Sequence, residues 1–432
     1  MPAGTDTDAL RDELRRATSG SCRHADAFVE RYAHIALRHV GGRTADLMTT
    51  RRAGTSVRRV DGDGVAYQAD DDPARVLEVL GAEQAAFDLS AGHAHLDDLV
   101  LAVEEAARSA DPRITQVLVD AELSAQQIAV VGVDEVRRDQ RSLLYLTIRV
   151  IAEENGRRAT GFLTPGTSAA DLSLDAAAAG RAAADRALIA LAARPAPVAH
   201  LPVVVGPGRG MVLVHEACCH PLEADEVLRG SVYADRLGER IAAPGVSIVD
   251  DPTLAGAVGS YGVDDDGTAA RPTTLVDDGT LASFLSDRVT SERLGLPITP
   301  NGRRDGFHHR PIPRMTNTRV LAGGVTPEDI IADTRFGLYA PHVGGGEVLE
   351  STGDFVFRVM NGYLIENGRI TDPIGETTVR GNGAEVLRSI DAVGDDVELG
   401  VAKCGKFGQL IPVGVCGPTL RIGSLLVGGT DA

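Results

Sequence analysis

Apolar residues recur along the first half of the chain with helical spacing in some segments and strand spacing in others. In residues 24–38, Ala25, Phe28, Val29 and Ile35 would share one face of a helix with 3.6 residues per turn. The same period predicts further helices at 7–17, 73–89, 96–109 and 171–193. Alternating or continuous apolar runs predict strands at 46–50, 55–60, 64–68, 113–120, 128–134, 142–152 and 157–163.

Turn and linker signals then divide the chain. Asn155-Gly156, Asp278-Gly279 and Asn367-Gly368 each separate two such runs, which is typical of tight β-hairpins. The proline-containing stretch 192–200 is the strongest linker signal. We therefore predict an α+β protein with an α/β N-terminal domain, residues 1–195. A mostly antiparallel, β-rich C-terminal domain, residues 200–432, would follow, interrupted by one helix that binds a metal.

The candidate chemistry of that helix lies in the run His215-Glu216-Ala217-Cys218-Cys219-His220. Imidazoles bind zinc, and a neighbouring carboxylate can accept a proton from a water that the metal activates. Histidines five residues apart lie roughly 140° apart on a regular helix, so they cannot face one ion. The helix must widen to an i→i+5 turn or end there, and Pro221 favours the same outcome. A buried helix that happens to carry two histidines is the alternative.

A thiolate would complete the ligand set, and the sequence offers two candidates. Cys404 lies between Lys403 and Lys406, the only lysines of the chain, and a nearby cation favours a thiolate. Cys219 follows His215 by four residues and would share its face on a regular helix. We favour Cys404, because the widened turn then uses both histidines; a small buried thiol is the alternative role for either cysteine.

Three separated motifs resemble the TldD/PmbA family, and more narrowly its metal-carrying TldD-like branch. They are HEACCHPLEAD from His215, PNGRRDGF from Pro300, and CGKFGQLIPVGVCGPTL from Cys404. The resemblance implies zinc on His215, His220 and Cys404, with Glu216 as the catalytic base. It also implies peptidase or amide hydrolase activity on peptides or peptide-like molecules. Family members form dimers, so it further implies a homodimer or a heterodimer with a TldD/PmbA-type relative.

Other residues have weaker signals. Glu223 would orient a ligand histidine or lie on the surface as a solvated carboxylate. A substrate carboxylate or the oxyanion of the reaction would bind to the polar segment 303–310 and the nearby Arg314. This segment includes His308 and His309. A basic surface loop paired with acids is the alternative for this segment.

Two neighbouring glycines mark a strand edge that could bind a peptide. Gly345 and Gly346 would let an extended peptide add along a strand edge.

A net charge of −18 argues against nucleic-acid binding, and the absence of a long apolar run argues against a membrane span. Five cysteines without a secretion signal are typical of thiols in a cytoplasmic enzyme.

The sequence thus predicts a zinc-dependent metallopeptidase or amide hydrolase. Two alternatives are a dedicated amide hydrolase of one natural-product intermediate and a non-catalytic partner subunit of a TldD/PmbA-type dimer. The intact histidines, glutamate and cysteine argue against the non-catalytic role.

Overall fold

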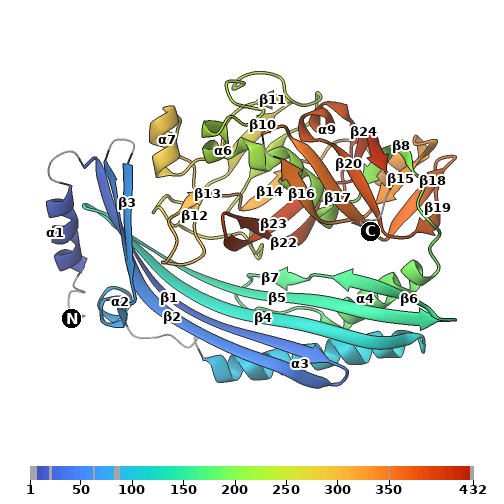
Figure 1. Ribbon diagram of the computed structural model, residues 1–432, viewed down its shortest axis with the longest axis horizontal. Coiled ribbons are helices and arrows are strands. Elements are labelled where there is room, and N and C mark those ends of the chain that lie inside the picture. Colours follow the sequence, from blue (N-terminus) through green and yellow to red (C-terminus); the bar gives the residue numbers. More distant parts are fainter. Residues whose placement is uncertain (1–6, 19–21, 62–63, 82–87, 350, 429–432) are drawn as a thin grey trace.

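A computed structural model describes residues 7–18, 22–61, 64–81, 88–349 and 351–428. The N-terminal part forms a long, curved antiparallel sheet of seven strands with the order β3-β2-β1-β4-β5-β6, in which β7 also pairs with β5 (Figure 1). Its strands are β1 (His24–Val40), β2 (Arg43–Asp61), β3 (Gly64–Asp70), β4 (Ile114–Val131), β5 (Val136–Glu154), β6 (Arg157–Leu163) and β7 (Gly166–Thr167).

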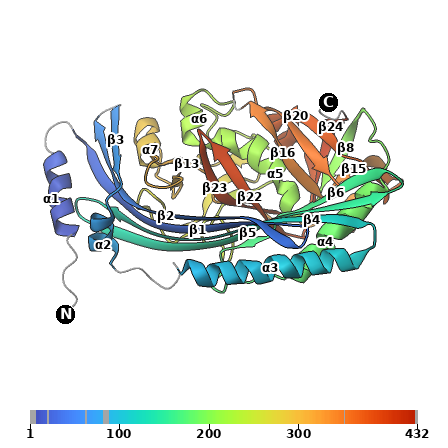
Figure 2. The same cartoon turned by 60° about the horizontal axis from the view of Figure 1, so that its bottom comes forward.

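Helices cover one face of this sheet, and the C-terminal part of the chain lies on the other face (Figure 2). The helices of the N-terminal part are α1 (Thr7–Ala17), α2 (Pro73–Leu80), α3 (Leu89–Ala110) and α4 (Ala176–Leu191). A Cβ atom on Gly180 of α4 would lie 2.3 Å from the carbonyl oxygen of Val103 of α3. Glycine at this position therefore allows the two helices to pack closely.

The helix predicted at 24–38 is wrong, because this segment is the central strand β1, which pairs with both β2 and β4. Residues from Ala25 to Glu30 are buried without a break. A strand covered on both faces does not show the alternation of a half-exposed strand, so its apolar residues matched a helical period by coincidence. The helix predicted at 171–193 is present as α4 but begins at Ala176, where the Asp175 side chain caps it.

The C-terminal part contains two main sheets and a short strand pair. The nine-stranded sheet has the order β16-β17-β20-β24-β8-β15-β18-β19, with β21 paired to β24; the six-stranded sheet has the order β11-β10-β9-β14-β23-β22. The strands of the first sheet are β8 (Ala199–Val205), β15 (Phe336–Ala340), β16 (His342–Leu349), β17 (Asp354–Met360), β18 (Gly362–Glu366), β19 (Arg369–Ile374), β20 (Thr377–Asn382), β21 (Ile390–Val393) and β24 (Leu420–Val427). The remaining strands are β9 (Ile248–Asp250), β10 (Thr273–Asp277), β11 (Thr280–Leu281), β14 (Asn317–Val320), β22 (Glu398–Lys406) and β23 (Gln409–Gly417), with β12 (Gly302–Arg303) paired to β13 (Ile312–Pro313).

These sheets and the N-terminal helices confirm the predicted α+β class. The three predicted hairpin turns are also present, since the strands on either side of Asn155-Gly156, Asp278-Gly279 and Asn367-Gly368 pair with each other. All six turn residues have positive φ, which Asn, Asp and Gly tolerate best. The division into domains of 1–195 and 200–432 stays a prediction.

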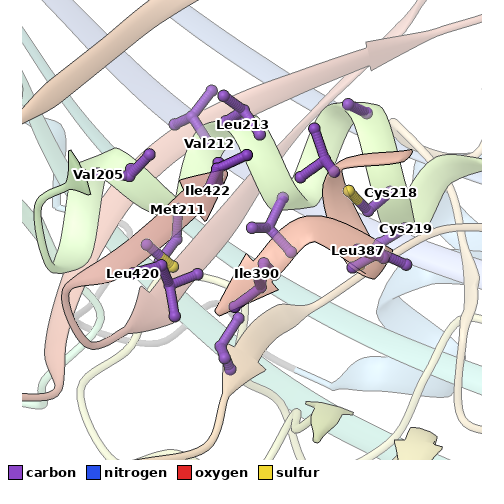
Figure 3. Close-up of a cluster of buried hydrophobic side chains, with 14 of the residues drawn as sticks. Val205, Met211, Val212, Leu213, Cys218, Cys219, Leu387, Ile390, Leu420 and Ile422 are labelled. Atoms are coloured by element: carbon purple, nitrogen blue, oxygen red, sulfur yellow. The ribbon is translucent and has the colours of Figure 1, made fainter. Parts of the chain in front are cut away.

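One irregular helical stretch leaves β8 and enters the C-terminal core. It consists of η2 (Gly208–Met211), α5 (Val212–Val214), η3 (His215–Cys219), η4 (His220–Leu222) and α6 (Ala224–Leu228). Figure 3 shows Met211 beside Leu420, and Cys218 and Cys219 beside Leu387, within one buried cluster. This packing fixes one face of the stretch. The other helices of this part are α7 (Arg288–Leu294), α8 (Pro327–Ala332) and α9 (Gly383–Ser389).

Buried contacts join the C-terminal part to the N-terminal sheet. Arg58 of β2 lies 2.9 Å from the Asp266 carboxylate and also pairs with Asp26 of β1, and all three side chains are buried. Phe307 is fully buried and packs with Phe28 and its neighbours. Within the described part of the chain, no helix is long and apolar enough to cross a membrane.

Candidate metal centre

The two histidines of the predicted motif are brought together by a widened helical turn. Residues His215–Cys219 form a π-helix, and the backbone N–H of His220 donates to the carbonyl of His215, five residues earlier. This confirms the predicted departure from a regular helix. The extra residue in the turn brings the two imidazoles to a centroid distance of 5.4 Å, edge to face. Pro221 lies in the 3-10 turn that follows and ends the helix.

Cys404 reaches the same point from the distant strand β22. Its Sγ lies 3.0 Å from Nε2 of His220, and the thiol is 2% exposed. One ligand atom from each of His215, Glu216, His220 and Cys404 lies within 4.8 Å of the others. The structure therefore brings together all four residues that the sequence analysis selected for the centre.

Hydrogen bonds orient both imidazoles in the same way. His215 Nδ1 lies 2.9 Å from Thr318 Oγ1, and His220 Nδ1 lies 2.8 Å from Glu223 Oε2. Each ring is thus held at Nδ1 and presents Nε2 to the centre. His215 Nε2 is buried and has no hydrogen-bond partner among the described residues. A buried imidazole nitrogen without a partner, facing a second imidazole and a thiol, fits a zinc ion.

The charges of the centre suit a cation. Burial opposes ionisation of the Cys404 thiol, but His220, through its charge and its hydrogen bond, lowers the pKa of Cys404 to about 5, and the nearby His215 imidazole acts in the same direction. Burial likewise opposes a positive charge on His220, but Cys404, Glu223 and Glu216 raise its pKa well above the ordinary value. Burial also opposes ionisation of Glu216, but His220 and then His215 lower its pKa to about 2. A proton or a metal ion would therefore be stabilised here.

Glu223 holds the His220 imidazole in place through a buried hydrogen bond. Its side chain is fully buried, so the surface alternative for Glu223 is wrong. Besides His220, it accepts from Lys406 Nζ at 2.8 Å and from the backbone N–H of Met315 at 3.2 Å. Burial opposes its ionisation, but Lys406 and His220 lower its pKa well below the ordinary value. A charged acceptor for the His220 N–H is therefore maintained.

The lysines beside Cys404 have different partners from the one we predicted. Lys406 pairs with Glu223 and Asp225, and Lys403 forms two contacts of 2.7 Å with Glu122 of β4. Alternate residues of a strand point to opposite faces, and each lysine reaches carboxylates instead of the thiol. The histidines are the main groups that lower the pKa of Cys404.

Cys219, the competing thiol, lies in the apolar core and outside the group of four converging residues. Burial raises its pKa well above the ordinary value, so a neutral thiol is favoured. The same holds for the adjacent Cys218, whose pKa burial raises. These surroundings are typical of packing residues and favour Cys404 as the ligand.

The basic segment 303–310 occupies a different place from the one we expected. Phe307 inserts into the N-terminal part, and Tyr67 of β3 donates to the carbonyls of Phe307 and His309. His308 is 55% exposed and lies 3.9 Å from Asp71. Neither histidine is among the described residues that line the cavity at the metal centre. The buried Phe307 decides where this loop lies.

Arg314 is buried and bonded to the protein backbone, so it does not face a substrate. It is 1% exposed, and its Nη2 donates to the carbonyl oxygen of Cys404 at 2.6 Å. It therefore holds the backbone of β22 at Cys404. Because Arg314 is buried, a substrate would not reach it.

A cavity of about 350 Å³ opens onto the centre. Glu216 and His220 line it from the helix, Gly346 from β16, and Lys406 and Phe407 from the β22–β23 hairpin. Gly345 lines the adjoining cavity, which shares Gly346. Both β16 and β22 end their sheets, so each has one edge that pairs with no described strand.

The sequence analysis missed Thr318 and the buried role of Lys406. Thr318 belongs to a Thr-Asn-Thr run without a distinctive pattern, and its partner His215 is 103 residues away. Only comparison of many relatives would have provided a signal for it.

Comparisons with known proteins agree with this geometry. A family model described as "PmbA/TldA metallopeptidase C-terminal domain" matches residues 199–429, and one described as "PmbA/TldA metallopeptidase central domain" matches residues 88–191. A protein of Haemophilus influenzae named "Metalloprotease TldD homolog" is 38% identical over 346 residues, which cover 77% of this chain and 72% of that protein. A "Zinc metalloprotease TldD homolog" of Saccharolobus solfataricus is 32% identical over 229 residues, 53% of this chain and 51% of that protein.

Solved structures share the fold. A protein of Thermotoga maritima described as a putative modulator of a DNA gyrase superposes with a TM-score of 0.74 at 19% identity, covering 98% of this chain and 100% of its own. TldE from Thermococcus kodakarensis gives a TM-score of 0.74 at 16% identity, with coverage of 98% and 100%. At these identities the likeness concerns the fold alone.

Proposed function

This chain belongs to the PmbA/TldD family of metallopeptidases, and we propose that it hydrolyses amide bonds with a zinc ion held by His215, His220 and Cys404. Relatives named metalloproteases support a metallopeptidase-type function. One observation supports the zinc site most directly. The buried, unpartnered Nε2 of His215 faces a second imidazole and a thiol whose surroundings favour the thiolate.

The chemistry divides between the ion and the protein. A zinc ion held by His215, His220 and Cys404 would supply Lewis-acid chemistry for the attack of water on the amide carbonyl. Glu216 is ionised, lines the cavity and is 27% exposed on its side chain, so its carboxylate can accept the proton of the attacking water. The same oxygen then gives that proton to the leaving amine. Thr318 and Glu223 hold the imidazoles in place throughout.

The substrate that fits best is an extended peptide or a peptide-like small molecule. A cavity of about 350 Å³ accommodates a few residues and excludes a folded domain. Gly346 is exposed at the unpaired edge of β16 beside the centre, so the backbone of this edge can form main-chain hydrogen bonds with a substrate. Such bonds are tolerant of side-chain identity.

Three variants test this proposal. We expect Glu216→Gln to keep zinc but to lose about 10²–10⁴ of the hydrolysis rate, the usual share of general acid–base catalysis. Cys404→Ala should lose both zinc and hydrolysis, and Cys219→Ala should keep both. Metal content by mass spectrometry and cleavage of an unstructured peptide mixture are the measurements. Zinc lost from the Cys219 variant and kept in the Cys404 variant would overturn the ligand assignment.

A further inference from the structure

A second cavity, of about 1060 Å³, adjoins the metal centre. It lies between β5 and β6 of the N-terminal sheet and strands β16 and β17, and Gly346 lines both cavities. The residues of β16 from Gly344 to Glu347 line its wall. The unpaired edge of β16 therefore extends from the metal centre into this space.

Two arginines at this cavity bind only neutral groups. Arg209 lines it, and its Nη1 donates to Thr164 Oγ1 at 2.8 Å and to the carbonyl of Val401. Arg186 Nη1 donates at 2.7 Å to the carbonyl of Phe162, which also lines the cavity. Within the described part of the chain, no carboxylate forms an ion pair with either guanidinium.

The two arginines lie close enough for their charges to act on neighbouring groups. Burial, and then the charge of Arg209, lowers the pKa of Arg186 to about 10. Burial, and then both arginines, lowers the pKa of His342 of β16 to about 3, and His342 Nδ1 is buried without a described partner. By contrast, the buried Arg58 and Arg141 have carboxylate partners, which raise their pKa. The protein has a net charge of −18, yet no described acid forms an ion pair with Arg186 or Arg209. His342 completes this cluster of three side chains as a neutral imidazole that can donate a hydrogen bond. Half-buried charges without a counterion favour the binding of an anion.

The distance from this cluster to the metal centre follows from the backbone. Arg209 and His215 are six positions apart along the helical stretch, which corresponds to about 10 Å between their backbones. Strand β22 runs alongside, since a Cβ atom on Gly400 would lie 2.7 Å from Arg209 N, and four residues later Cys404 reaches the centre. Four strand residues span about 13 Å. An extended peptide bridges 10–13 Å with about three or four residues.

We propose that Arg209, supported by Arg186 and His342, forms an anion subsite for a substrate carboxylate. The carboxylate lies about three or four residues from the amide bond placed at the metal centre. It belongs either to the C-terminus of the peptide or to an Asp or Glu side chain. The proposal rests on the proposed function, because the metal centre defines where the scissile bond lies.

Peptide binding tests the subsite without hydrolysis. The zinc-loaded Glu216→Gln protein is titrated, by fluorescence anisotropy, with a labelled unstructured octapeptide of neutral side chains. The peptide is used as the free acid, as the C-terminal amide, and as amides with one Glu moved along the sequence, with Gln at the same position as control. We expect the free acid, or one Glu position, to bind about 10–100-fold more tightly than the neutral amide, as for a charge-assisted hydrogen bond.

Substitutions at the cluster locate the effect. Adding Arg209→Gln should reduce the preference to within about twofold without weakening the neutral peptide. Arg158→Gln is the matched control, since Arg158 lines the same cavity but is 74% exposed and pairs with Glu153. If circular dichroism shows that Arg209→Gln does not fold, Arg186→Gln replaces it.

The outcomes separate the subsite from the catalytic proposal. Equal binding of charged and neutral peptides overturns the subsite, and so does a preference that survives both arginine substitutions. The position that gives tight binding distinguishes a C-terminal carboxylate from an acidic side chain. If the Glu216→Gln protein binds charged peptides selectively but the wild type hydrolyses no peptide, the proposed function is wrong and the subsite stands. Hydrolysis of charged and neutral peptides at equal rates, with equal affinities, sinks the subsite alone.

Discussion

Replacing Glu223 with Gln removes the charge behind His220 and keeps the size of the side chain. The carboxylate now accepts hydrogen bonds from His220 Nδ1 at 2.8 Å, Lys406 Nζ at 2.8 Å and Met315 N at 3.2 Å. An amide has one acceptor oxygen, so its NH₂ group would face at least one of these donors. Lys406 keeps Asp225 at 2.7 Å, so this cation is not left unpaired.

The expected loss is in zinc affinity. A carboxylate that accepts from a ligand imidazole raises the basicity of that ligand, and removing such a partner costs about 10–100-fold in affinity. This corresponds to about 1.4–2.7 kcal/mol of binding free energy. Glu223→Gln should therefore bind zinc 10–100-fold more weakly than the wild type and still fold.

A competition titration against a chromophoric chelator measures the zinc affinity, and thermal melts of the zinc-free proteins report folding. Glu226→Gln is the matched control. It removes a charge 3.2 Å from the same lysine, and no contact with His220 is found among its described interactions. We expect its zinc affinity to stay within about threefold of the wild type, below the smallest loss expected for a ligand partner. Equal affinities for both variants and the wild type, with both folded, would refute the role of Glu223.

Three further predictions concern the rest of the chain. Burial opposes ionisation of Glu122, but His34 and Lys403 lower its pKa to about 2 from an ordinary value of 4.5. The ionised carboxylate therefore stabilises the fold above pH 4.5, and this stabilisation is lost as the pH falls towards 2. Urea unfolding over this range should show a shallower pH dependence for Glu122→Gln than for the wild type, and identical profiles would contradict this. Phe307→Ala should lower the free energy of unfolding by about 3–5 kcal/mol, because it empties a buried aromatic site, whereas His308→Ala should change stability by no more than about 0.5 kcal/mol and leave hydrolysis intact. Light scattering should give about twice the 45.2 kDa chain mass for the protein alone or with a TldD/PmbA-type relative, because Phe407 and Leu410 are apolar and more than half exposed at one hairpin; a monomer in both cases argues against the dimer.

A strand that is covered on both faces was not recognisable from the sequence. The segment from His24 to Val40 has helices on one side and the C-terminal part on the other, and its apolar residues lost the period of two that reveals a strand. The tight turns were predictable, because Asn-Gly and Asp-Gly favour positive φ whatever surrounds them.

The sequence by itself determined the local chemistry of the centre. The five-residue spacing of His215 and His220, together with Pro221, predicted a helix that widens or ends there, since hydrogen bonding and steric limits within a helix depend only on neighbouring residues. The tertiary structure decided which distant groups meet there. Cys404 lies 184 residues from His220, and the lysines next to it turned out to pair with carboxylates. Contacts between residues so far apart in sequence depend on how strands pair across whole sheets, which no local pattern specifies.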